Sequence, residues 1–165
     1  MNAEKDTAHE QALAQLASIR EMVAALECDY DRLDELKEEL AALQSAIKAD
    51  DSPMGEEEMD ARTDLAAWME DNGQELTELL EAAGDCADEG EARERIEQDA
   101  LSVEVRSDWH APGDDSGPSE FRIVLCTGGP HVQIRGELDE HNQPCRAWLE
   151  YQDWGTPLTD RKSTR

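Results

Sequence analysis

The chain has 165 residues, of which 41 are acidic and 15 are basic, so its formal net charge at pH 7 is −26. Residues 1–100 hold 30 acidic and 8 basic residues, a net charge of −22, whereas residues 101–165 hold 11 and 7, a net charge of −4. Such an excess repels nucleic acid and anionic membranes and attracts basic protein surfaces. Composition therefore argues against direct binding of nucleic acid or of a membrane surface.

Compartment and redox state follow from what the sequence lacks. No apolar run approaches the roughly 20 residues that span a membrane, and no signal-peptide pattern is recognised. We therefore expect a cytoplasmic protein. The cysteines are widely spaced and form no CxxC pair, so we expect reduced thiols at Cys28, Cys86, Cys126 and Cys145.

The first element predicted along the chain is a helix over residues 5–49, which contain neither Gly nor Pro and are rich in Ala, Leu, Glu and Lys. Apolar residues recur there at steps of three and four, the pattern of a coiled coil or a long helical arm. They are Leu16, Ile19, Val23, Leu26, Tyr30, Leu33, Leu40 and Ile47. A break at residues 27–29 is possible, but the unbroken phase of this heptad seam favours one helix.

A second helix is predicted from Pro53, capped by Ser52, to about Ala83, with Gly84 as its stop. Two long helices joined by a short Pro/Gly link favour an antiparallel helical hairpin. We therefore expect residues 1–88 to form an acidic helical arm.

The remainder predicts an antiparallel sheet. Period-two alternation indicates strands at 101–105, 121–126, 132–138 and 145–151, with a Gly-Gly-Pro turn at 128–130. A short helix at 91–98, together with part of the second helix, is expected to cover the apolar face. The predicted fold is α+β: the arm at 1–88, a four-stranded sheet domain at 89–157 that folds without the arm, and a flexible tail at 158–165.

Catalytic patterns are scarce. Cys126, His131, His141 and Cys145 have the residue types of a zinc site, but the predicted strands separate the two pairs by over about 20 Å. The sequence shows no serine in a nucleophile elbow and no glycine loop that leads into a helix. We expect neither an enzyme, nor a metal site, nor a cofactor.

Clustered carboxylates and one tryptophan are the candidate partner-binding residues. Carboxylates at helical spacing repeat about every 5.4 Å, close to the spacing of phosphates on a nucleic acid strand, although such a row can also be only a solvated face. Trp148 is expected either in the core under a helix or exposed as an anchor for a partner. The candidates are Asp31, Asp34, Glu35, Glu38, Glu39, Asp50, Asp51, Glu56, Glu57, Glu58 and Trp148.

Four short motifs in the second part of the chain carry a resemblance. They are LSVEVRSDWH at 101–110, LCTGGP at 125–130, RGELDEH at 135–141 and LEYQDWGTP at 149–157. In this order they resemble a family of small acidic proteins encoded by bacteriophages and other mobile elements. The resemblance implies a counter-defence protein, such as an anti-CRISPR or an inhibitor of a restriction enzyme, that occupies a basic nucleic-acid channel.

Two functions are therefore expected. The first is a non-enzymatic inhibitor that mimics nucleic acid and binds a basic surface of a host nucleic-acid-handling complex. The alternative is a structural or assembly protein that forms a homodimer through the heptad seam.

Overall fold

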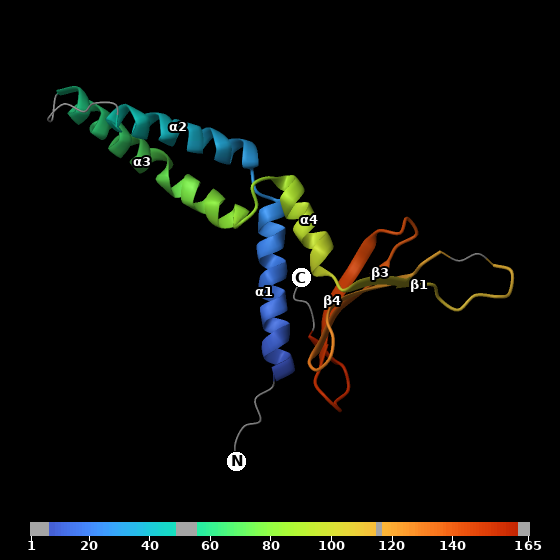
Figure 1. The fold of residues 1–165 in the computed structure, drawn as a ribbon. Coiled ribbons are helices and arrows are strands. Elements are labelled where there is room, and N and C mark those ends of the chain that lie inside the picture. The colour runs from blue at the N-terminus through green and yellow to red at the C-terminus, as the bar shows by residue number, and fades with distance from the viewer. Residues whose placement is uncertain (1–6, 49–55, 115–116, 162–165) are drawn as a thin grey trace, which may run out of the picture. The chain divides into compact units, whose positions relative to one another are not determined.

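The computed structural model describes residues 7–48, 56–114 and 117–161, and it confirms the α+β class with an antiparallel sheet (Figure 1). The helices are α1 (Thr7–Leu26), α2 (Tyr30–Lys48), α3 (Glu56–Ala83) and α4 (Glu89–Asp99). The strands are β1 (Ser102–Arg106), β2 (Glu120–Cys126), β3 (His131–Leu138), β4 (Pro144–Gln152) and β5 (Thr159–Arg161). No helix among the described residues is long and apolar enough to cross a membrane.

The chain divides into two compact units. One comprises residues 21–94, and the other comprises the residues up to Arg20 together with those from Arg95 onward. This division differs from the predicted boundary at residue 88, because the first part of α1 belongs with the sheet.

The prediction of one helix over residues 5–49 is wrong, because the helix ends at Leu26 and a new one begins at Tyr30. Asp29 is the N-cap of α2: its Oδ1 accepts a hydrogen bond from the Arg32 N–H at 3.0 Å, and its carbonyl accepts one from the Leu33 N–H. An N-cap carboxylate satisfies a donor that would otherwise lack a partner in the first turn. The heptad phase runs unbroken across this cap, so the apolar pattern alone does not reveal it.

Within residues 21–94, α2 and α3 pack side by side. Cys28 contacts Leu79, Arg32 contacts Glu75 and Glu39 contacts Trp68, so the two helices are antiparallel. Their shared core is almost closed to solvent and contains Leu33, Leu36, Leu76 and Ala83. Gly84 ends α3 with a positive φ of 57°, a conformation that glycine adopts without strain.

In the other unit the strands follow the order β1-β2-β3-β4-β5, with every neighbouring pair antiparallel. The predicted tail thus contributes a strand at Thr159–Arg161, while residues 162–165 lie outside the described part. Alternation gives the sheet one apolar and one polar face. Gly136 lies opposite Phe121, and a Cβ at Gly136 would lie 2.3 Å from the Phe121 ring, so glycine is needed for this close approach.

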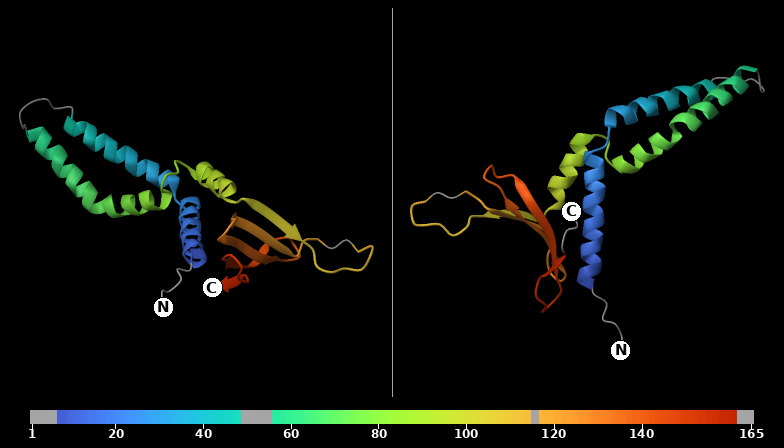
Figure 2. Two further views of the ribbon diagram at one scale, coloured as in Figure 1. Left: turned by 60° about the horizontal axis from the view of Figure 1, so that its bottom comes forward. Right: turned by 180° about the vertical axis from the view of Figure 1, so that it is seen from behind.

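The apolar face is covered by α1, and the prediction that residues 91–98 cover it is wrong. The ribbon of α1 runs beside the sheet (Figure 2). Ala12, Leu16 and Ile19 lie one helical turn apart and pack on the sheet, and the ring centroids of His9 and Tyr151 are 5.7 Å apart. The sheet contributes Leu125, Val132 and Leu149 to this cluster. In contrast α4, EGEARERIEQD, has too few apolar residues for this role, and only its Ala92 is buried.

We predict that a charge at Ala12 destabilises the sheet. Ala12 is fully buried in the α1–sheet core, and an unpaired buried carboxylate costs several kcal/mol. Ala12→Asp should therefore strongly accelerate hydrogen exchange at the amides of β2, β3 and β4. Ala17→Asp, at an exposed position of the same helix, is the matched control. Unchanged exchange in Ala12→Asp would mean that the sheet does not depend on α1.

Candidate functional site

Five of the predicted carboxylates form an exposed surface on α2. Asp31, Asp34, Glu35 and Glu38 stand at i, i+3, i+4 and i+7, on the helix face opposite the buried Leu33 and Leu36. The fifth, Glu39, lies at the margin of this face. All five are exposed.

Glu39 differs from its neighbours because it also holds the hairpin together. Its Oε2 accepts a hydrogen bond of 2.8 Å from Nε1 of Trp68 on α3. The polar end of that half-buried indole is thereby satisfied. Substitution of Glu39 would therefore disturb packing as well as charge.

The predicted carboxylates at the junction of the second and third helices lie only partly within the described residues. Asp50 and Asp51 lie outside the described residues, whereas Glu56, Glu57 and Glu58 form the first turn of α3, where carboxylates suit the positive end of the helix dipole. The positions of these three side chains are not described.

A second acidic row lies on α3 and was not among the predicted sites. Five exposed carboxylates recur there at steps of four, seven, four and three residues, which places them on one helix face. The same spacing test that selects the α2 residues finds this row in the sequence. Its members are Asp60, Asp64, Asp71, Glu75 and Glu78.

Few cations compensate these carboxylates. Five exposed carboxylates on α2 and seven on α3 face three described basic side chains, Arg32, Lys37 and Arg62. Arg32 donates to both carboxylate oxygens of Glu75, at 3.1 and 3.0 Å, and to Glu35 at 3.3 Å. These bonds lower the pKa of Glu75. The hairpin therefore presents a strongly negative surface with little basic charge of its own.

We name the exposed carboxylates of α2 and α3 the hairpin acidic surface. Its members with described side chains are Asp31, Asp34, Glu35, Glu38, Glu39, Asp60, Asp64, Glu70, Asp71, Glu75, Glu78 and Glu81.

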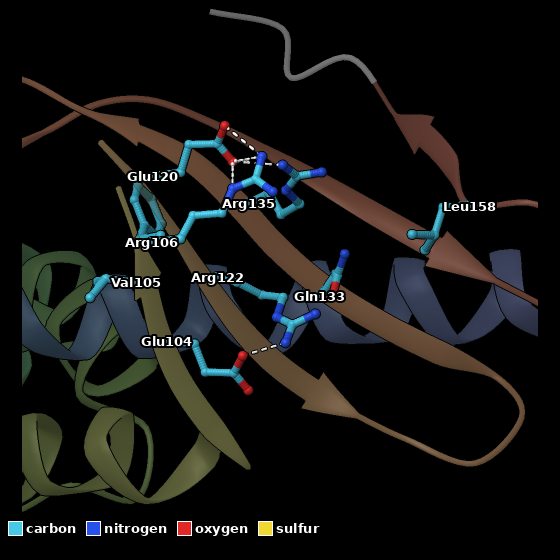
Figure 3. Close-up of a pocket in the computed structure, with 9 residues that line it drawn as sticks. Glu104, Val105, Arg106, Glu120, Arg122, Gln133, Arg135 and Leu158 are labelled. Atoms are coloured by element: carbon cyan, nitrogen blue, oxygen red, sulfur yellow. Dashed lines mark hydrogen bonds and ion pairs between the residues drawn. The ribbon is translucent and has the colours of Figure 1, made fainter. Parts of the chain in front are cut away.

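On the sheet, in contrast to the shortage of basic side chains on the hairpin, the carboxylates are paired with arginines. Its polar face has a hollow of about 340 Å³, in which guanidinium and carboxylate groups face one another (Figure 3). The lining residues are Glu104, Val105, Arg106, Glu120, Phe121, Arg122, Gln133, Arg135 and Leu158.

Glu120 is the centre of this arrangement. It accepts two hydrogen bonds from Arg106, at 3.0 and 2.8 Å, and one from Arg135 at 2.7 Å. The two guanidiniums, that of Arg106 first, lower the pKa of Glu120 from its ordinary value of 4.5 to about 2. Nearby, Arg122 is paired with Glu104 and lowers the pKa of that carboxyl as well.

Trp148 lies on this polar face, in register with Arg135, and not in the core that α1 covers. Its Nε1 donates to the buried Glu150 at 2.8 Å, and the Arg135 guanidinium lies 5.9 Å from the ring centroid. Glu150 also accepts a 2.6 Å hydrogen bond from Gln133. Alternation along β4 places the side chains of Trp148 and Leu149 on opposite faces of the sheet. The half-buried indole therefore lies among polar side chains.

Ion pairs dominate the polar face of the sheet. Each of the three guanidiniums that line the hollow is paired with a carboxylate of the protein. These arginines therefore do not form an open binding site for an external anion. Within residues 7–48, 56–114 and 117–161, no group of three or more His, Cys, Asp or Glu side chains is placed to hold a metal ion.

No protein-family model, curated protein or solved structure matches the chain. The resemblance to small acidic phage proteins is not tested by these comparisons and stays a prediction.

We predict that Glu120 makes the stability of the sheet pH-dependent. Because its pKa is lower in the folded protein, its contribution is present above pH 4.5 and is lost as the pH falls from 4.5 toward about 2. The protection factors of the β2 and β3 amides against hydrogen exchange, corrected for the pH dependence of intrinsic exchange, should fall less steeply across that window in Glu120→Gln than in the wild type. Glu140→Gln, which removes an exposed carboxylate of the same unit, is the control. Identical pH profiles for Glu120→Gln and the wild type would contradict this role.

Proposed function

We propose that this protein is a non-enzymatic binding protein that uses the hairpin acidic surface to occupy a basic, nucleic-acid-binding surface of another protein. The observation that carries the proposal is the exposure of five carboxylates on α2 and seven on α3 with only three basic side chains described beside them. Like charges at i and i+4 destabilise a helix, so a fold that serves stability alone gains nothing from such a row.

The packing of the hairpin supports this use of its outer surface. The buried apolar residues of both helices meet in their shared core, where Leu33 and Leu36 are almost completely buried. Outside that core α3 exposes Met59, Met69 and Leu80, but the exposed carboxylates of α2 and α3 outnumber these apolar side chains. On each helix the carboxylates follow the helical repeat of about 5.4 Å, which approximates a row of phosphates.

The partner class follows from charge. A surface this negative repels nucleic acid and is complementary to grooves lined with Lys and Arg. The resemblance to phage proteins supports a narrower assignment within the proposal, namely an anti-CRISPR protein or an inhibitor of a restriction enzyme that acts in the cytoplasm of the host cell. Neither assignment needs a cofactor or a metal.

The alternative, an assembly protein that dimerises through the heptad seam, is less well supported. Leu16 and Ile19 pack on the sheet, whereas Leu33 and Leu40 pack in the hairpin. The seam is therefore divided between two intramolecular cores.

Charge reversal on α2 tests the proposal. Asp34, Glu35 and Glu38 have exposed side chains that are not part of the hairpin core, so their conversion to Lys should cost little stability. Facing a basic channel, three lysines should weaken binding on the order of a thousandfold. The measurement is capture of nucleic-acid-binding proteins from nuclease-treated host lysate with the wild type or the triple variant as bait, followed by titration of the captured protein.

The matched control is Glu27, Glu97 and Glu140 changed to Lys, which alters the net charge equally at exposed positions outside α2 and α3. Circular dichroism should show native helical content in both variants. The control should bind like the wild type, and added DNA or RNA should compete with the captured protein. Equal binding by the wild type and the α2 variant would show that the hairpin acidic surface is only solvated.

Salt gives an independent prediction. The Debye length falls from about 8 Å at physiological ionic strength to about 3 Å at 1 M, so contacts between exposed charges should weaken sharply. Titration calorimetry of the captured protein should show a large loss of affinity across this range. An affinity unchanged between 0.1 M and 1 M salt, roughly the range of those Debye lengths, would count against a charge-driven interface.

A further inference from the structure

The strand β1 exposes both one backbone edge and its apolar side chains. It stands at one end of the sheet order, so one side of its backbone pairs with β2 and the other side has no neighbouring strand among the described residues. Its apolar face is also open, since Val103 and Val105 have exposed fractions of 66% and 62%, and Leu101, just before the strand, is 61% exposed. An edge strand that is both unpaired and apolar is a template for a further strand.

The hydrogen bonds show which backbone groups point outward. The Arg106 carbonyl accepts a bond of 2.9 Å from the Ser119 N–H, on the side of β2. Because successive residues of a strand direct their backbone groups to opposite sides, those of Val103 and Val105 point to the open edge.

The side chains at this edge are self-complementary. On the polar face Glu104 pairs with Arg122, and Arg106 pairs with Glu120. The four charges sum to zero, in the part of the chain whose net charge is only −4 for residues 101–165. The charged side chains at this edge therefore add little net repulsion between two copies.

From this we infer that two copies of the chain associate by antiparallel pairing of β1 with β1, Val105 of one copy lying opposite Val105 of the other. In this register Glu104 of each copy lies opposite Arg106 of the second copy. The row across the junction then reads Arg122, Glu104, Arg106 and Glu120, with charges that alternate in sign. On the apolar face the register of Val105 with Phe121 extends into a row of two valines between two phenylalanines.

Charge selects this register over its neighbours. A two-fold axis at Glu104 would place two carboxylates opposite each other, which is unfavourable. An axis at Val103 would place Glu104 opposite Ser102 and leave Arg106 without a charged partner across the junction. Only the axis at Val105 gives two opposite-charge pairs. This interface is separate from the hairpin acidic surface and does not depend on its function.

A charge-swap experiment tests the inference with the full chain. Glu104→Arg alone places Arg opposite Arg106, and Arg106→Glu alone places Glu opposite Glu104, so each variant should lose self-association by about tenfold or more. An equimolar mixture restores an opposite-charge pair on both sides of the axis and should form the heterodimer. Sedimentation or light scattering up to about 1 mM protein should show twice the 18.4 kDa monomer mass for the wild type and for the mixture.

Cysteine crosslinking tests the register. Paired residues of an antiparallel ladder lie about 5.5 Å apart between Cα atoms, within disulfide range. Val105→Cys should crosslink to itself under a mild oxidant, and Val103→Cys should not. The wild type, with its own four cysteines, is oxidised in parallel, and mass spectrometry locates each crosslink.

Several results would overturn the inference. A wild type that stays monomeric over the whole range would leave the edge to another occupant or to none. Single variants that still dimerise, or a mixture that does not, would contradict the proposed Glu104–Arg106 pairs across the junction. Crosslinking at position 103 instead of 105 would contradict the register.

Discussion

The contact between α1 and the apolar face of the sheet constrains the use of every other helix. An antiparallel sheet with one apolar face needs a cover, and Ala12, Leu16 and Ile19 supply it. Because α1 is engaged there, α2 buries its leucines against α3 instead. With that core closed, the remaining surface of the hairpin carries the carboxylates outward. The acidic surface is thus a consequence of how the apolar residues are divided between two cores.

The chain handles charge in two opposite ways. On the sheet, Glu104 and Glu120 are each matched to arginines of neighbouring strands, and Glu150 is buried with polar partners. On the hairpin twelve exposed carboxylates share three described basic side chains, of which Arg32 pairs with Glu35 and Glu75 and Lys37 pairs with Asp34. Exposed ion pairs contribute little to stability, so the matching on the sheet serves mainly to define neighbours and register. The shortage of basic side chains on the hairpin leaves a negative field that acts beyond the protein surface.

Local patterns allowed much of this fold to be predicted, whereas long-range choices did not. Period-two alternation predicted the first four strands, and glycine at 84 and 128 predicted two chain reversals, both with positive φ. The break at Asp29 was missed because apolar spacing does not register an N-cap, and the covering helix was assigned by proximity in sequence. For the site, exposure of the α2 carboxylates followed from periodicity. The α3 row went unnoticed because its residues are spread over more turns, and the location of Trp148 depended on strand register.

The division of the sheet unit across the chain has a consequence for folding during synthesis. Residues 27–101 separate α1 from every strand, yet the hairpin of α2 and α3 within them contains its own core and can fold as soon as it emerges. Helix α1 is made earlier but finds its partners Leu125, Val132 and Leu149 only after the last long strand has left the ribosome. Its apolar stripe is therefore exposed throughout that interval. The central segment matures first, and the helix made earliest is among the last to dock.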